Sequence, residues 1–323
     1  MKVTYKMIDR QLRLRGFLIN LLMNKSSEAK FIKLMHTSKK LTEKQKGRKI
    51  RGLHSTEEWI TREDGSKLRI CVYRPLHEVS NVPGVLWLHG GGYALGIPEF
   101  SSDTYKRLIK ASGCTIIAPD YRLSIEAPYP AALEDAYTAL KWMKTHAEAL
   151  GIRPDQLMVG GESAGGGLAA ALTLYARDKN EVNIAFQMPL YPMIDDQMTT
   201  ESAKDNNAPV WNSRMNEWSW KLYLGDLYDK DVPYYAAPAR ATDYHNLPPA
   251  VTFVGALEPF RDETIHYVEN LRKAGVHVDF ELYNGCYHGF DKVNPRADSS
   301  KKSTAFFLDS FKYAVEHYFA NQK

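Results

Sequence analysis

The motif Gly161-Glu162-Ser163-Ala164-Gly165 combines a nucleophilic side chain with the two glycines that a very sharp turn requires. An apolar run at 156–159 precedes it, and an Ala- and Leu-rich run at 168–176 follows. This pattern predicts a buried strand that turns into a helix at Ser163. Such a turn strains the serine backbone and lifts its hydroxyl over the positive end of the helix. A glycine-rich turn with an ordinary serine has the same pattern, so the motif alone is moderately specific.

A serine hydroxyl attacks an acyl carbon only where a base takes its proton and donors bind the oxyanion. The run His89-Gly90-Gly91-Gly92 directly follows an apolar segment and offers backbone N–H groups that no side chain shields. We expect the N–H groups of Gly91, Gly92 and Ala164 to form the oxyanion hole. The other interpretation of this run is a phosphate-binding loop, but neither Gly-Lys-Ser/Thr nor G-x-G-x-x-G follows it.

The remaining two groups of such a site are expected late in the chain, in the order serine, acid, histidine. His288 follows the last predicted strand and is the expected base. Glu258 ends the preceding predicted strand and is the expected acid, with Asp262 as the alternative. Asp262 and Glu263 fall in the first turn of the next helix, where carboxylates favour the helix dipole. Cys286 has no turn motif of its own, and we interpret it as a packing residue.

The elements that position these residues follow from the alternation of apolar runs. Alternating strand and helix patterns predict an α/β fold whose mainly parallel sheet has helices on both faces. Two strands at 53–74 around Asp64-Gly65 predict an antiparallel type I′ hairpin at the start of the sheet. Further strands are expected at 85–88, 114–118, 157–159, 184–190, 250–254 and 278–283, and helices at 102–111, 131–150, 168–176, 260–274 and 305–320.

Two segments depart from this alternation. Residues 191–247 contain no clear strand pattern but hold several Trp and Tyr residues, and residues 1–50 are helical and basic. We therefore predict a helical N-terminal cap segment at 1–50 and a catalytic domain at 51–323, with an aromatic-rich cap insertion at 195–245. A cap would cover the carboxyl edge of the sheet, where open α/β sheets bind ligands. A helical insertion with its own small core is compatible with that role.

The net charge of +4 is unevenly distributed, because residues 1–51 carry +12 and the remainder carries −8. Two interpretations of the basic segment compete: its helices pack on the body of the protein, or they lie on an anionic membrane. We expect the first, and neither a membrane nor a nucleic acid as a partner. Its apolar positions recur at helical spacing: Ile8, Leu12, Ile19, Leu22, Phe31, Leu34 and Met35.

Composition places the chain among ordinary globular proteins, with 44% hydrophobic and 25% charged residues in 323. Three cysteines are an odd number, which argues against a disulfide framework and for a reducing compartment. The apolar run Gly16–Met23 is too short to span a bilayer, and Asn24–Ser27 lacks the small residues of a cleavage site. We therefore expect neither a signal peptide nor a membrane helix, and a cytoplasmic location.

Taken together, these motifs resemble the hormone-sensitive-lipase-like carboxylesterases of the α/β-hydrolase fold. The resemblance covers about residues 83 to 291 in family order. It implies an N-terminal helical cap, a Ser163–Glu258–His288 triad and hydrolysis of carboxylic esters. The segments that carry it are His89–Gly92, Asp120–Leu123 with Glu126, Tyr129–Ala132 with Glu134-Asp135, Gly161–Gly165, Leu247–Ala250, Glu258-Pro259 with Arg261–Glu263, and Tyr287–Phe290.

Two positions depart from the family pattern. The family usually has Asp where Glu258 stands, and Ala-Pro where Ser124-Ile125 stands. Glu also serves as the triad acid on this fold, so the first departure leaves the chemistry possible.

The expected function is a serine carboxylesterase that acts on short to medium acyl esters through an acyl-enzyme, as a monomer or homodimer. No metal or organic cofactor is expected. The alternatives are an amidase or formamidase with the same triad, a membrane-surface lipase and, least favoured, a non-catalytic ligand receptor.

Overall fold

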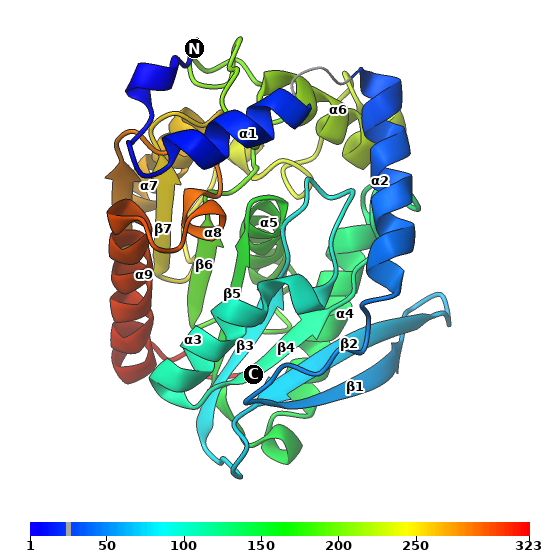
Figure 1. Ribbon diagram of the computed structural model, residues 1–323. Helices are drawn as coiled ribbons and strands as arrows, with labels where there is room; N and C mark the ends of the chain where they lie inside the picture. The colour runs from blue at the N-terminus through cyan, green and yellow to red at the C-terminus, as the bar shows by residue number, and fades with distance from the viewer. Residues whose placement is uncertain (24–26) are drawn as a thin grey trace.

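One twisted sheet organises the computed structural model, which describes residues 1–23 and 27–323 (Figure 1). In these residues eight strands follow the order β1-β2-β4-β3-β5-β6-β7-β8. Strand β2 runs antiparallel to both β1 and β4, and the other neighbours pair in parallel. The strands are β1 (His54–Thr61), β2 (Lys67–Arg74), β3 (Val82–Leu88), β4 (Thr115–Pro119), β5 (Ile152–Glu162), β6 (Phe186–Leu190), β7 (Ala250–Gly255) and β8 (Val278–Tyr283).

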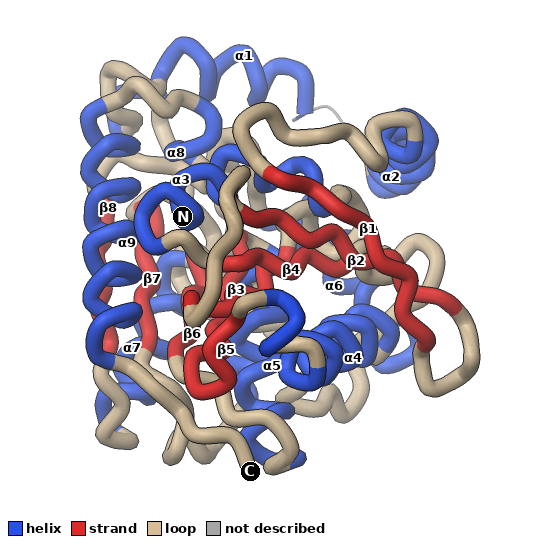
Figure 2. Tube along the Cα trace, turned by 90° about the horizontal axis from the view of Figure 1, so that it is seen from below, coloured by secondary structure: helices blue, strands red, loops and turns tan. Residues whose placement is uncertain are grey.

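Helices cover both faces of this sheet, as the alternating pattern predicts (Figure 2). On one face, Trp87 of β3 lies 6.0 Å from Phe307 of α9, and α3 packs against α9. On the other face, α4, α5 and α7 cover the strands. The helices are α1 (Arg13–Met23), α2 (Glu28–Glu43), α3 (Ser102–Ser112), α4 (Ala131–Thr145), α5 (Ala164–Lys179), α6 (Ser213–Leu224), α7 (Arg261–Lys273), α8 (Phe290–Val293) and α9 (Asp298–His317), with single 3₁₀ turns at Tyr5–Met7, Pro98–Ser101, Glu148–Leu150, Gly225–Leu227 and Pro238–Arg240.

The first hairpin forms where it is predicted, but its turn is different. Thr61 pairs with Lys67, so five residues connect the strands, and the Gly65 N–H donates to the carbonyl of Arg62 at 3.0 Å. A type I′ turn needs positive φ at both central residues. Here Gly65 has φ +83° whereas Asp64 does not have positive φ, and the Asp64 carboxylate accepts the Ser66 N–H at 2.9 Å.

The long helix expected at 131–150 is also shorter than predicted. Helix α4 ends at Thr145, and a separate 3₁₀ turn leads to Gly151, which has φ +69°. The predicted glycine stop is thus found, but it closes the 3₁₀ turn.

Helices α1, α2 and α6 lie together beyond the carboxyl ends of the parallel strands (Figure 1). Residues 191–247 are all described and contain helical turns and no strand, as expected. Phe31 of α2 packs on Trp218 of α6, with their ring centroids 5.5 Å apart. Met35 is buried as well, whereas Leu34 is 45% exposed, so only part of the predicted α2 stripe faces inward.

The N-terminal segment before α2 also packs on the body. Ile8 and Leu12 are buried, and the Tyr287 hydroxyl donates to the Leu12 carbonyl at 3.1 Å. The side chain of Leu22 and residues 24–26, where no cleavage site is expected, lie outside the described part of the chain. Among the described residues, no helix is long and apolar enough to cross a membrane.

Candidate active site

Ser163 occupies the sharp turn between β5 and α5, with φ +59° and ψ −121°. This conformation is strained for a residue with a side chain and persists where the surrounding chain holds it. A Cβ on Gly161 would lie 2.3 Å from the Gly165 carbonyl oxygen, and a Cβ on Gly165 would lie 2.1 Å from that of Leu88. Both positions therefore require glycine, as the motif predicts. The Ser163 N–H donates to the Leu190 carbonyl at 3.0 Å and fastens the turn to β6.

The structure brings Ser163, His288 and Glu258 together. His288 Nε2 lies 2.8 Å from Ser163 Oγ, and His288 Nδ1 lies 2.5 Å from Glu258 Oε2. The second Glu258 oxygen accepts the Gly255 N–H at 2.8 Å, and the whole side chain is buried. A carboxylate at Nδ1 selects the tautomer with its proton there, which leaves Nε2 free to accept the serine proton.

The alternative acid, Asp262, lies elsewhere. Its carboxylate accepts the Ser202 N–H at 2.8 Å and pairs with Arg261 at 2.6 Å.

Cys286 is buried, and burial raises the pKa of its thiol to about 12, which agrees with a packing role.

The glycine run after β3 passes beside the nucleophile. A Cβ built on Gly90 would lie 3.4 Å from Ser163 Cβ, and Gly91 and Gly92 have φ +129° and +60°. The run is held by His89, whose ring stacks on Tyr121 at 4.2 Å. The Tyr121 hydroxyl donates to the His89 carbonyl at 2.7 Å, and burial lowers the pKa of the His89 ring.

Ala164, the third expected oxyanion donor, is the first residue of α5. The first N–H groups of a helix have no partner within it, and they lie at the positive end of its dipole. Ala164 adjoins Ser163 after β5, and the glycine run follows the neighbouring strand β3.

An aromatic shell surrounds the imidazole of His288. The ring centroids of Tyr191, Trp211 and Phe260 lie 5.2, 6.2 and 5.0 Å from it. Trp211 comes from the insertion and also covers the glycine run, since a Cβ on Gly92 would lie 2.4 Å from its ring. Sequence reasoning noted the aromatic residues of the insertion but had no signal to choose Trp211 among them.

Sequence reasoning also missed a set of charged groups behind the turn. Glu162 pairs with Lys292 at 3.0 Å, which ties the serine turn to the short helix α8 after His288. The neighbouring Asp291 is buried, burial raises the pKa of its carboxyl, and Tyr191 donates to it at 3.5 Å. The one indication in the sequence was closeness along the chain: Asp291 and Lys292 follow His288 by three and four positions.

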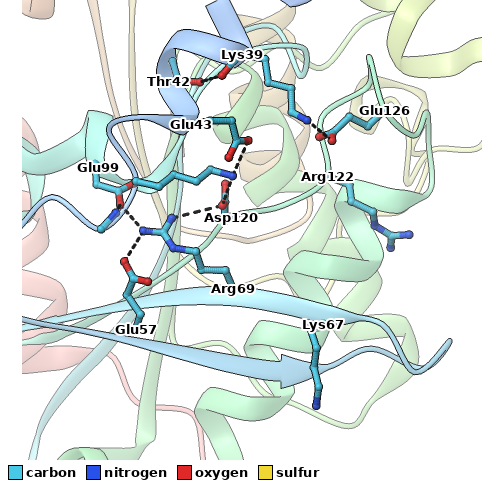
Figure 3. A network of polar contacts seen from close by, with 12 residues as sticks. Lys39, Thr42, Glu43, Glu57, Lys67, Arg69, Glu99, Asp120, Arg122 and Glu126 are labelled. Carbon is cyan, nitrogen blue, oxygen red and sulfur yellow. Dashed lines mark hydrogen bonds and ion pairs between the residues drawn. The ribbon is translucent and has the colours of Figure 1, made fainter.

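A second polar cluster joins the end of α2 to the sheet (Figure 3). Arg69 of β2 is 4% exposed and pairs with Glu57 at 2.8 Å, with Asp120 at 3.4 Å and with Glu99. Glu57, Cys71 and Glu99 have the ligand atoms of a possible metal site. Both carboxylates instead face the Arg69 guanidinium, and burial raises the pKa of Cys71 to about 12, so this group is an ion-pair network around a buried arginine.

Comparison with known proteins places this geometry in a family. Residues 85–292 match the family model described as the alpha/beta hydrolase fold. The chain belongs to the α/β-hydrolase family. The matched range of this hydrolase contains Ser163, Glu258 and His288, together with the glycine run after β3.

Proteins that are similar to this hydrolase bear the names of esterases. Carboxylesterase NlhH of Mycobacterium tuberculosis is 33% identical over 266 residues, which cover 80% of this chain and 82% of NlhH. Esterase LipI of the same organism is 34% identical over 212 residues, 65% of this chain and 66% of LipI. The solved structure of a bacterial heroin esterase matches 97% of this chain and 99% of its own, with 34% identity and a TM-score of 0.87.

These relatives confirm two predictions from the sequence. The hydrolase is a member of the hormone-sensitive-lipase-like carboxylesterases, and its enzyme class is that of the carboxylic ester hydrolases.

Proposed function

We propose that the chain is a serine carboxylesterase in which Ser163 is the nucleophile, His288 the general base and Glu258 the acid that orients His288. The observation that carries this proposal is the unbroken hydrogen-bond chain from Ser163 Oγ through both ring nitrogens of His288 to Glu258. Burial of all three side chains supports it, because charge development is stabilised more strongly where water is excluded.

The reaction that this arrangement supports has two halves. His288 takes the Ser163 proton as Oγ attacks the ester carbonyl, and the N–H groups of Gly91, Gly92 and Ala164 bind the oxyanion. The imidazolium then gives its proton to the leaving alcohol, and an acyl-enzyme remains. Water repeats the sequence and releases the acid. These steps use only groups of the chain.

We propose the same division of the chain as from the sequence: a cap formed by 1–50 and the 195–245 insertion, and a catalytic domain at 51–323. Packing of α2 on α6 and of Tyr287 on Leu12 supports a cap that covers the site. A cytoplasmic location, with a monomer or homodimer, also remains part of the proposal. Burial of all three free cysteines is compatible with a reducing compartment.

The substrates that fit best are esters with short to medium acyl groups. Trp211 is 9% exposed and covers the glycine run, so a bulky side chain of the insertion borders the expected oxyanion donors. A series of p-nitrophenyl esters tests this: kcat/KM should peak at a short or medium chain and fall for long ones. Matched p-nitroanilides separate an amidase, because equal rates on amide and ester would favour that alternative.

Substitution of the nucleophile tests the proposal as a whole. Ser163→Ala should lower kcat on p-nitrophenyl acetate by at least about 10³-fold, while unfolding by urea stays within about 1 kcal/mol of the parent. Residual turnover within tenfold of the parent would contradict the assignment of Ser163.

A further inference from the structure

The segment around α1 has one apolar side that packs on the body of the protein. Leu12 is fully buried, and a Cβ on Gly16 would lie 2.7 Å from the ring of Tyr287, the neighbour of His288. Helix α1 therefore sits close against the active-site loop, at the outer surface of the cap (Figure 1).

A second apolar set on α1 faces outward. Leu14, Phe17, Leu18 and Leu21 are 67, 52, 51 and 56% exposed. Their spacing of three, four and seven residues places them on one face of the helix, and we call this set the α1 stripe. Tyr5 adds to it, since its ring meets that of Phe17 edge-on at 6.3 Å and is 53% exposed. Single exposed apolar residues are ordinary, but a contiguous row of them marks an interaction surface.

Positive charges flank the α1 stripe. Arg13 and Arg15 stand on either side of Leu14, and residues 1–23 hold three further cations, Lys2, Lys6 and Arg10, against the single carboxylate of Asp9. Arg13 donates to the carbonyls of Ile8 and Lys6, and Arg15 to that of Val293. These acceptors are neutral, so the bonds fix the two guanidinium groups beside the stripe without cancelling their charge.

The charge distinguishes between possible partners of this face. A second copy of the chain would bring together two such segments, each with five cations and one carboxylate in residues 1–23, which costs electrostatic energy. An anionic bilayer satisfies both halves of the surface, because aliphatic and aromatic side chains enter the headgroup region while Lys and Arg meet lipid phosphates.

We propose that the protein docks on anionic membrane surfaces through α1, with the α1 stripe inserted and the flanking cations at the phosphates. This revises the expectation that the basic helices only pack on the body. The helical spacing of the apolar residues correctly predicted that Ile8 and Leu12 face inward. The outward-facing apolar row could be recognised only in the structure, which shows which side of the helix is covered. Docking does not depend on the ester chemistry, so it holds or fails separately from the proposed function.

Co-sedimentation of the full chain with vesicles tests the proposal. At low salt the protein should bind equimolar phosphatidylcholine–phosphatidylglycerol vesicles at least about tenfold more tightly than phosphatidylcholine vesicles, and about 0.5 M salt should remove most of this difference. Equal binding to both vesicles, or no binding at low salt, would overturn it.

Matched variants locate the surface. Leu14→Ser with Leu18→Ser should weaken vesicle binding at least about tenfold, and Lys6→Gln with Arg10→Gln about 30-fold at low salt. Leu76→Ser is the control: Leu76 is 73% exposed but follows β2, whose opposite direction places it at the edge of the sheet away from the cap. It should bind like the parent, as should Ser163→Ala.

All the surface variants should hydrolyse soluble p-nitrophenyl acetate at the parent rate, which shows that they fold. Stripe variants that bind vesicles as well as Leu76→Ser does would overturn the proposal. So would light scattering that shows a dimer of the parent, lost in the stripe variants, without any vesicle binding.

Discussion

The carboxylate of Glu258 is held at both oxygens, by His288 Nδ1 and by the Gly255 N–H. Glu258→Gln keeps the size of the side chain but removes the charge that stabilises the imidazolium. It should lower kcat by about 10²- to 10⁴-fold with KM little changed. Glu258→Asp retains the charge one methylene further from His288 and should lose less, about tenfold to 100-fold. Steady-state kinetics on one soluble ester measures both.

Asp262→Asn is the matched control for this pair of variants. Asp262 binds Ser202 and Arg261 rather than His288, so its loss should leave kcat within about threefold of the parent. A larger fall in Asp262→Asn than in Glu258→Gln would reverse the assignment of the acid.

At the residue scale, the sequence predicted the residues whose order along the chain is characteristic of this chemistry: serine, then acid, then histidine. Ser163, Glu258 and His288 follow three of the last four predicted strands, and parallel strands bring such ends to one edge. Trp211 and Asp291 could not be chosen in the same way. Trp211 comes from a segment without periodicity, and burial of Asp291 depends on packing between α8 and the serine turn, which no local pattern encodes.

At the scale of elements, Glu263 links helix α7 to the start of the insertion. Its carboxylate accepts the N–H groups of Ile194 at 2.8 Å and Asp195 at 3.2 Å. Burial, more than the charge of nearby Asp195, raises the pKa of the Glu263 carboxyl well above its ordinary value. In addition to the predicted interaction with the helix dipole, Glu263 therefore holds α7 to the chain at Ile194 and Asp195.

The raised pKa gives Glu263 a definite effect on stability. Between the unfolded pKa, about 4.3, and the raised folded pKa, the folded chain holds a proton that the unfolded chain lacks. The free energy of unfolding therefore falls as pH rises through this window. Glu263→Gln resembles the protonated form, so its advantage over the parent should grow from about pH 5 to about pH 8. Urea unfolding at several pH values measures this.

Glu263→Ala is the companion variant. It leaves the two buried N–H groups without an acceptor and should cost about 2 to 4 kcal/mol near pH 5, a cost that shrinks as pH rises because only the parent loses stability through Glu263. Parallel pH profiles for the parent and Glu263→Gln would contradict the account.

The sequence predicted which segments form helices and strands better than it predicted where each helix or turn ends. The strands at 250–254 and 278–283 were predicted nearly to their ends: the first is an apolar run that is buried throughout, and the second alternates apolar and polar residues at the edge of the sheet. The type I′ turn was wrong because five residues rather than two connect β1 and β2, and α4 ends at Thr145 while Gly151 closes a separate 3₁₀ turn. Apolar periodicity does not report either difference.

At the scale of the whole molecule, Arg69 joins the first hairpin to β4 and to the loop before α3. Arg69→Met would leave the side chains of Glu99 and Asp120, 8 and 11% exposed, without this partner. We expect a loss of about 3 to 5 kcal/mol in the free energy of unfolding. Urea unfolding near neutral pH measures it.

Arg153→Met provides the control, because the Arg153–Asp155 pair is 29 and 34% exposed and should contribute less than about 1 kcal/mol. Equal losses in the two variants would show that the Arg69 network adds no stability of its own. This network was not predictable from sequence, since its members come from four separated segments.

The most direct measurement of the central claim is covalent trapping by diethyl p-nitrophenyl phosphate, which phosphorylates an activated serine. The account predicts one equivalent of released p-nitrophenol, loss of esterase activity in proportion, and a single diethylphosphoryl group on the peptide that contains Ser163. Activity lost with the label on another residue, or full activity after Ser163 is labelled, would contradict it.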